Sequence, residues 1–269
     1  MMKKTTLFSL LVPAALLVGC HERSAVNGLT VEMLDCPLGV AAEHPRLSWR
    51  IESALPATVQ TGYRILVSTD PGDLETGENL IWDSGDVPSD RSVLVPYEGP
   101  ELESRRDYYW KVRVATNHGD TLWSEPSRWS MALLDDSDWQ ARWIGYDSCL
   151  NRTDTLGVFS RLAARYLRKE FDAGRDIAQA RLYISGLGLY ECYLNGCRVG
   201  EDVLAPTATD YTKTVCYNVY DVTDLLDEGV NTIGVILGNG RFFSMRTVTY
   251  TIPFTQVTIP GVRNYGYPK

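Results

Sequence analysis

The alternation of apolar and polar residues along this chain restricts it to folds built from β-strands. Over residues 29–133, apolar side chains recur at every second position, for example at Tyr108, Trp110, Val112 and Val114. A period of two predicts strands that have one buried and one solvated face. No segment in this region shows the 3.6-residue period of an amphipathic helix. The first half of the chain is therefore expected to form antiparallel sheet.

Turn-forming residues divide this region into short strands. Clusters of Pro, Gly, Asn, Asp and Ser occur at residues 70–73, 84–86, 88–90 and 117–120. About a hundred residues that carry roughly seven short strands are typical of an immunoglobulin-like or fibronectin type III sandwich. We assign this domain to residues 29–134, with Trp49 and Trp110 as core residues because both lie inside alternating strands.

The second half of the chain predicts another all-β domain, over residues 135–269. Strands are expected at residues 166–171, 180–184, 190–194, 215–220 and 232–237. Asn195-Gly196 is a strong signal for a two-residue hairpin turn. We interpret this domain as a jelly-roll sandwich. Because no strand that closes the sheet is evident before Lys269, the domain is expected to be incomplete.

Three aspartates at the domain boundary, in residues 135–139, resemble a metal-binding loop in composition only. The central Gly and the closing Glu of a calcium-binding EF-hand loop are missing. We therefore expect a solvated linker between the two domains.

The N-terminal residues predict export. Lys3 and Lys4 precede an apolar run of about twelve residues, which is too short to span a membrane as a helix. Residues 17–20 resemble the lipobox of bacterial lipoproteins, so we predict a signal peptide over residues 1–19, a lipidated Cys20 and a linker over residues 20–28. The alternative is an ordinary signal peptide that is cut near Gly19. The prediction is an exported lipoprotein, anchored in a membrane as a periplasmic, outer-membrane or cell-surface protein.

Charge and cysteine content exclude several classes. The chain has 34 acidic and 26 basic residues, a net charge of -8, and no cluster of Lys or Arg, which argues against nucleic acid as a partner. Its membrane contact would come from the acyl chains on Cys20. The odd number of cysteines that remain, without CxxC spacing, argues against a disulfide framework and a zinc site. We expect most of these thiols to be small buried apolar groups: Cys36, Cys149, Cys192, Cys197 and Cys216.

No catalytic constellation is evident. The three histidines share no motif, and there is no phosphate-binding loop, G-x-S-x-G or H-E-x-x-H sequence. Glycoside hydrolysis requires two carboxylates on either side of a sugar. The carboxylates of the second domain lie in turns and linkers, where such residues usually cap the backbone.

An ordered set of motifs nevertheless resembles one enzyme family. Residues 45–49 and 82–85, then the segments at 139–145, 166–171, 188–200, 209–211, 220–226 and 237–243, are similar to the N-terminal accessory domains of bacterial α-L-rhamnosidases of glycoside hydrolase family 78. The resemblance covers nearly all of the chain after residue 20. It implies inverting hydrolysis of terminal α-L-rhamnose on glycans by acidic residues of an (α/α)6 barrel. No helical segment here could supply that barrel, so we assign no catalytic residue in this chain and expect an inactive N-terminal fragment.

The resemblance also implies ligand binding. Some family members bind L-rhamnose and calcium through this type of jelly roll, so calcium is a candidate ligand, although no metal-binding residue can be assigned and no cofactor is required. The candidate carbohydrate-binding residues are Asp210, Tyr211, Asn239 and Arg241, with Glu201 and Asp202 as weaker ones. Polar groups beside an aromatic ring in a loop suit a sugar. Their alternative role is turn formation and packing.

Two other functions remain open at this point. The chain could be a non-catalytic, lipid-anchored carbohydrate-binding module. It could also be the front part of another exo-glycosidase such as a β-galactosidase, because Asn-Gly hairpins and Asp-Val-Thr turns occur in that jelly roll too.

Overall fold

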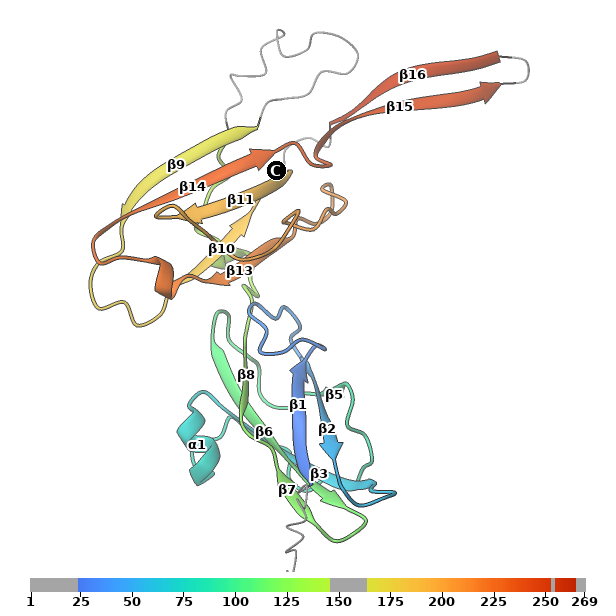
Figure 1. Cartoon of the computed structure of the whole chain (residues 1–269), viewed down its shortest axis with the longest axis vertical. Coiled ribbons are helices and arrows are strands. Elements are labelled where there is room, and N and C mark those ends of the chain that lie inside the picture. The colour runs from blue at the N-terminus through green and yellow to red at the C-terminus, as the bar shows by residue number, and fades with distance from the viewer. Residues whose placement is uncertain (1–23, 146–163, 253–254, 265–269) are drawn as a thin grey trace, which may run out of the picture.

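The computed structural model describes residues 24–145, 164–252 and 255–264, which form two β-domains stacked end to end (Figure 1). The first domain is a sandwich of two antiparallel sheets. One sheet contains β1 (Ala25–Val31), β2 (Arg46–Glu52) and β5 (Val95–Pro96). The other contains β3 (Gln60–Ser68), β4 (Trp82–Asp83), β6 (Asp107–Thr116), β7 (Thr121–Trp123) and β8 (Ser127–Ser130). The predicted immunoglobulin-like sandwich is confirmed.

Tryptophans fill the space between these two sheets, as predicted. Trp49 on β2 and Trp110 on β6 are 1% and 0% exposed. The Trp49 indole N–H donates to Gln60 Oε1 at 2.9 Å, so its polar atom is satisfied in the core. The indole nitrogen of Trp110 is buried and has no hydrogen-bond partner among the described residues.

Two features of the first domain differ from the prediction. Strand β1 begins at Ala25, inside the segment predicted as linker. The sequence pattern did not reveal its first residues, because the register shift between Asn27 and Thr30 and the positive φ of Gly28 interrupt the alternation that marks a strand. A six-residue helix, α1 (Pro71–Thr76), replaces the turn predicted at 70–73. Asp70 caps it by accepting from Gly72 N at 2.8 Å. One helical turn and a half is too short to produce a visible period.

The segment at 135–139 connects the two domains, and Asp135, Asp136 and Ser137 are exposed as expected of a solvated linker, but it is more ordered than the sequence indicated. Residues Asp136–Asp138 form a 3-10 helix that Asp135 caps through a capping box. The Asp138 carboxylate accepts from the Ser104 hydroxyl at 2.5 Å, and the Trp139 ring packs edge-on against Tyr217 with centroids 5.1 Å apart. These contacts with residues distant in sequence fix the connection between the domains.

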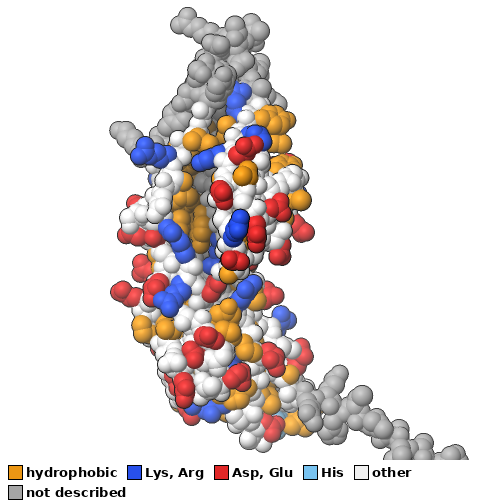
Figure 2. Space-filling view, turned by 90° about the vertical axis from the view of Figure 1, so that its left-hand side faces the viewer, with side chains coloured by type: hydrophobic (Ala, Val, Ile, Leu, Met, Phe, Trp, Pro, Cys, Tyr) orange, Lys and Arg blue, Asp and Glu red, His pale blue; other side chains and the backbone are white. Residues whose placement is uncertain are grey.

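The second domain is also a sandwich. A four-stranded sheet has the order β12 (Cys197–Arg198), β11 (Leu189–Leu194), β14 (Val230–Gly238) and β9 (Arg165–Asp172). It faces a two-stranded sheet of β10 (Arg181–Ser185) and β13 (Tyr217–Asp221). Inner side chains such as Leu182, Ile184 and Val235 are only partly buried. Figure 2 shows apolar side chains in a furrow on one face of this domain.

The hairpin predicted at Asn195-Gly196 is confirmed, with Leu194 opposite Cys197 in the β11–β12 pair. Asn195 and Gly196 have φ values of 49° and 84°, which suit a type I′ turn. The strands β15 (Phe243–Ile252) and β16 (Thr255–Asn264), which were not predicted, pair with each other and project from the domain (Figure 1).

The expectation of buried thiols holds for one of the four described cysteines. Cys192 is 1% exposed, and burial raises the pKa of its thiol to about 11. Cys36 and Cys197 are exposed and Cys216 is half-buried, so the prediction is wrong for the first two. Cys36 lies in a bend, and Cys197 directly follows the Asn195-Gly196 turn. All four are free thiols, while Cys20 and Cys149 lie outside the described residues.

Polar contacts join the two domains. Arg181 on β10 forms an ion pair with Asp107 on β6, and its other terminal nitrogen donates to the Arg105 carbonyl oxygen at 3.0 Å. The Tyr217 hydroxyl accepts from the Leu133 backbone N–H at 2.9 Å.

Candidate carbohydrate-binding site

Two glycine-containing turns meet at one end of the second domain, where β11 begins and β14 ends. Leu189 pairs with Gly238, so residues 186–188 lie against residues 238–240. A Cβ on Gly188 would lie 2.1 Å from the Gly238 carbonyl oxygen, and Gly188 has a positive φ of 139°. Only glycine fits here. The two backbones therefore approach closely enough to fix the position of the loop that carries Asn239 and Arg241.

A second loop, residues 199–216, reaches the same end of the domain. The Tyr211 ring packs edge-on against Phe242 with centroids 5.5 Å apart and an interplanar angle of 87°. This contact brings two of the predicted segments together, because Phe242 directly follows Arg241. Tyr211 is 4% exposed, so its ring packs within the domain and does not offer an open stacking face.

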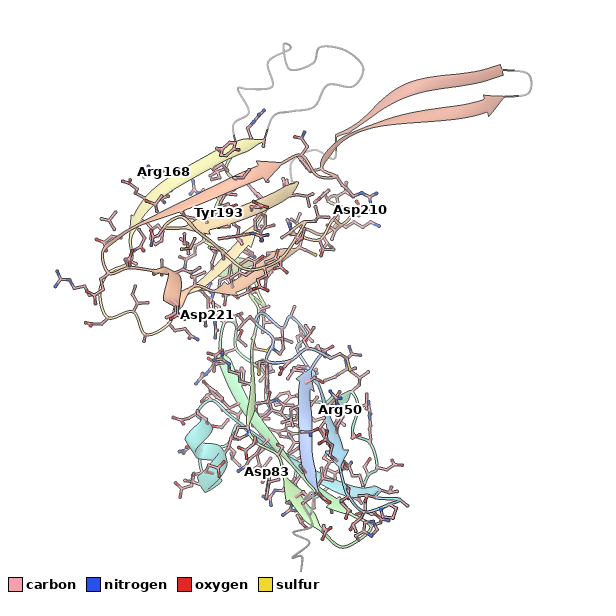
Figure 3. The ribbon with its side chains drawn as sticks, in the orientation of Figure 1. Arg50, Asp83, Arg168, Tyr193, Asp210 and Asp221 are labelled. Atoms are coloured by element: carbon pink, nitrogen blue, oxygen red, sulfur yellow. The ribbon has the colours of Figure 1, made fainter. Side chains whose placement is uncertain are left out.

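Asp210 is exposed and organises the turn that follows it. Its carboxylate accepts from the Thr212 hydroxyl at 2.6 Å and from the Thr212 N–H at 3.2 Å. The Thr212 hydrogen bonds hold the pKa of Asp210 below its ordinary value, since they stabilise the charged form. Figure 3 shows Asp210 at the edge of the domain, near the base of the β15–β16 hairpin.

Asn239 is half-buried and Arg241 is exposed. Both follow β14, on the loop that the glycine contact positions. The structure thus places Asp210, Asn239 and Arg241 on two loops that Tyr211 and Phe242 connect. Two exposed polar side chains and a half-buried amide could hydrogen-bond the hydroxyls of a sugar. Carbohydrate binding by these four residues remains a prediction.

Of the two weaker candidates, Asp202 belongs to a network that the sequence did not reveal. Its carboxylate accepts from the Tyr220 hydroxyl at 2.7 Å and from Asn218 Nδ2 at 3.4 Å. Tyr190 donates to Asn218 Oδ1 at 2.9 Å. Burial, together with the Asp202 hydrogen bond, raises the pKa of Tyr220 to about 12. Asp202 therefore attaches its loop to β13 although it is exposed, as Glu201 is too. The sequence contained one signal for this network, the hydroxyl and amide side chains on the predicted strands.

Other clefts are formed elsewhere by the described residues. A mainly polar cleft of about 680 Å³ opens between the domains, and its lining includes Tyr109, Arg128, Gln179, Asp221 and Asp224. Domain boundaries are common places for ligand sites, but such sites are lined mainly by apolar side chains, so the polar lining of this cleft does not favour a small ligand.

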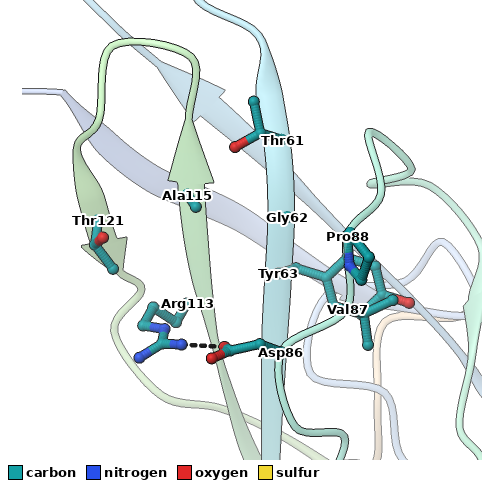
Figure 4. Close-up of a pocket in the computed structure, with 9 residues that line it drawn as sticks. All are labelled: Thr61, Gly62, Tyr63, Asp86, Val87, Pro88, Arg113, Ala115 and Thr121. Carbon is teal, nitrogen blue, oxygen red and sulfur yellow. Dashed lines mark hydrogen bonds and ion pairs between the residues drawn. The ribbon is translucent and has the colours of Figure 1, made fainter.

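A groove of about 430 Å³ lies on the first domain (Figure 4). Thr61, Tyr63 and Thr121 line it, and an ion pair between Arg113 and Asp86 crosses it. Because Arg113 also lies 5.7 Å from the centre of the Trp123 ring, its charge already has two partners.

The described residues contain no group of three or more His, Cys, Asp or Glu side chains that could hold a metal ion. Within the same residues, no helix is long and apolar enough to cross a membrane.

Both domains match family models. Residues 26–135 match the Rha78A-like N-terminal immunoglobulin domain, and residues 175–258 match the α-L-rhamnosidase N-terminal domain.

Similar proteins agree with these matches. An α-L-rhamnosidase from Formosa agariphila is 35% identical over 259 residues, which is 88% of this chain and 27% of that protein. One from Streptomyces avermitilis is 35% identical over 228 residues, which is 80% of this chain and 22% of that protein. The chain therefore spans about a quarter of the length of these relatives.

Solved structures show the same arrangement. The α-L-rhamnosidase from Dictyoglumus thermophilum superimposes with a TM-score of 0.74 at 32% identity, over 88% of this chain and 29% of that one. The enzyme from Aspergillus terreus gives a TM-score of 0.66 at 28% identity, over 88% of this chain and 28% of that one. By both of its domains, the chain belongs to the α-L-rhamnosidase family, of which it carries the N-terminal immunoglobulin-like domain and the rhamnosidase N-terminal domain.

Proposed function

We propose that this chain is the N-terminal part of an α-L-rhamnosidase that hydrolyses terminal α-L-rhamnose from glycans. The observation that supports this most strongly is the match of both domains, in order, to a rhamnosidase structure over 88% of the chain. Relatives that are α-L-rhamnosidases are about four times as long, so we place the hydrolytic residues in a part of the protein outside these 269 residues.

The two β-domains would then orient that part of the enzyme and bind glycan. The largely buried ion pair between Arg181 and Asp107, which joins the domains, suits a supporting role. The loops that carry Asp210, Asn239 and Arg241 are the proposed contact with rhamnose, because their polar groups are fixed by the Gly188 turn and the Tyr211–Phe242 contact.

The coding sequence beyond Lys269 gives the first test of hydrolysis. We expect the reading frame to continue with helical periodicity for roughly three hundred codons, the size of a barrel that would carry the two carboxylates of a glycosidase. The complete product should release L-rhamnose from a terminal rhamnoside. A complete product without this activity would contradict the proposal, as would a frame that encodes a different barrel, such as that of a β-galactosidase.

Sugar binding can be measured on the chain itself. In an L-rhamnose titration by calorimetry or NMR, Asn239→Ala and Arg241→Ala should each weaken binding about tenfold, since each removes hydrogen bonds to a hydroxyl. Arg175→Ala is the matched control, because Arg175 is also an exposed arginine but lies between β9 and β10, just after Asp172, which pairs with Val230 at the end of β14 away from Gly238. Unchanged rhamnose binding in both loop variants would show that Asn239 and Arg241 do not form the binding site. Repeating the titration in the presence of calcium tests whether calcium strengthens rhamnose binding.

We also propose that the protein is exported and anchored by a lipid on Cys20. The support is the charged, apolar and lipobox-like order of residues 1–20. Mass spectrometry of the mature protein should find a diacylglyceryl group on an N-terminal Cys20, and Cys20→Ser should release the protein from the membrane fraction. Cys36→Ser, which changes another exposed thiol, should leave the protein in that fraction. An unmodified N-terminus would contradict the anchor.

A further inference from the structure

The loop between β2 and β3, residues 53–59, has an exposed apolar surface. It reads Ser-Ala-Leu-Pro-Ala-Thr-Val and contains no charge. Leu55 is 47% exposed and Val59 is 52% exposed, and Ala54, Pro56 and Ala57 are exposed as well. We call this loop the apolar tip. It forms the end of the first domain that lies away from the second domain (Figure 1).

Hydrogen bonds fix the backbone of the apolar tip. The Ser53 hydroxyl accepts from the Thr58 hydroxyl at 3.0 Å and from the Leu55 N–H at 3.2 Å. Asn117 of the β6–β7 turn donates to the Ala57 carbonyl at 3.1 Å and accepts from the Val59 N–H at 2.9 Å. The polar groups of the loop are therefore hydrogen-bonded within the domain, and its apolar side chains are exposed to solvent.

The chain enters the first domain beside this loop. The hydroxyls of Ser24 and Ser53 are 2.8 Å apart. Cys20 is four residues before Ser24, and four residues span at most about 14 Å even when fully extended. A lipid on Cys20 would consequently hold Ser24 within about 14 Å of the lipidated residue, and would keep the apolar tip, whose first residue contacts Ser24, close to the bilayer.

We infer that the apolar tip lies on the membrane and inserts Leu55 and Val59 at the boundary between head groups and acyl chains. This inference rests on the proposed anchor at Cys20. The apolar faces of interfacial helices are buried about 5–10 Å into that boundary, and exposed apolar side chains on a loop gain from the same burial. The first domain then stands upright on the bilayer, and the second domain, with the proposed rhamnose-binding loops, faces away from the membrane.

The contact is apolar, not electrostatic. The chain carries a net charge of -8, and Glu52 and Asp120 flank the apolar tip and the adjacent turn. Anionic lipid would repel these carboxylates, so neither anionic lipid nor low salt should strengthen the contact.

Depth-dependent fluorescence quenching tests the inference on the acylated protein. All thiols other than the lipidated Cys20 and the buried Cys192 are first removed by Cys36→Ser, Cys149→Ser, Cys197→Ser and Cys216→Ser. An environment-sensitive dye is then attached to Leu55→Cys, with Val59→Cys as a second site in case the first variant folds poorly. The protein is reconstituted in phosphatidylcholine vesicles that contain lipids with a shallow nitroxide, with and without phosphatidylglycerol.

Leu204→Cys is the matched control, because Leu204 is 69% exposed on a loop of the second domain. We expect the nitroxide to quench about half or more of the emission at residues 55 and 59, and to have no effect at residue 204. Equal quenching at the apolar tip and at residue 204 on acylated protein overturns the inference while leaving the anchor intact. Protein whose Cys20 is not acylated in the mass spectrum overturns the anchor and this inference together.

Discussion

Arg181 of the second domain and Asp107 of the first domain form an ion pair whose side chains are 9% and 20% exposed. Gln179 Nε2 donates to the other Asp107 oxygen at 3.3 Å. The two residues are 74 positions apart in sequence, so the pair depends entirely on how the domains stack.

Removing Asp107 should loosen the junction between the domains. Asp107→Ala leaves the Arg181 guanidinium buried without its counter-charge, which should cost about 2–4 kcal/mol of unfolding free energy. Scanning calorimetry should then resolve two transitions where the parent shows coupled unfolding. Glu170→Ala removes a pair with Arg168 in which both side chains are more than half exposed, and should cost under about 1 kcal/mol. Equal losses in the two variants would show that the junction does not depend on this pair.

The two core tryptophans should respond differently to the same substitution. Trp49→Phe leaves the buried Gln60 oxygen without the donor 2.9 Å away, whereas Trp110→Phe removes an indole nitrogen that has no partner among the described residues. Both lose ring volume, but Trp49→Phe should lose about 1–3 kcal/mol more. Urea unfolding of the two variants measures the difference. A larger loss in Trp110→Phe would contradict the assigned hydrogen bonding.

Tyr220 should remain protonated well above the ordinary range of a tyrosine. Burial and its hydrogen bond to Asp202 raise its pKa from 10.0 to about 12. Because the folded state binds this proton more tightly than the unfolded state, the resulting stability is fully present below pH 10 and is lost as pH rises toward about 12. Tyrosinate absorbance during an alkaline titration should show the late step.

Asp202→Asn provides the control for that titration. It removes the negative charge beside Tyr220, so the late step should move to lower pH, while Asp224→Asn, an exposed carboxylate, should leave it in place. An unchanged late step in Asp202→Asn would mean that burial alone raises the pKa.

Gly188 should tolerate no side chain. Alanine would place Cβ 2.1 Å from the Gly238 carbonyl, which should cost about 3 kcal/mol or more and displace the loop that carries Asn239 and Arg241. Gly196→Ala is the matched control: it also has a positive φ, 84°, but no atom within 4 Å, so only about 1 kcal/mol is expected. Thermal unfolding measures both. The first variant should also lose rhamnose binding if the proposed site is correct, and equal destabilisation would refute the close approach.

The sequence by itself determined the features that follow from neighbouring residues. A period of two defines a strand and its buried face, so the two sandwiches and the burial of Trp49 and Trp110 could be predicted. The Asn195-Gly196 hairpin could be predicted because its turn geometry depends on those two residues alone. The family resemblance rested on the order of such local motifs.

The tertiary structure decided whatever depends on residues far apart in the chain. Asp138 is part of the junction between the domains through Ser104, and Asp202 is attached to β13 through Tyr220. Cys36 and Cys197 are exposed beside turns. Tyr211, a candidate carbohydrate-binding residue whose alternative role was packing, packs against Phe242. A polar or aromatic residue in a loop has the same local sequence signal whether it meets solvent or a distant partner. Only the stacking of the domains and the path of the loops determine which partner it meets.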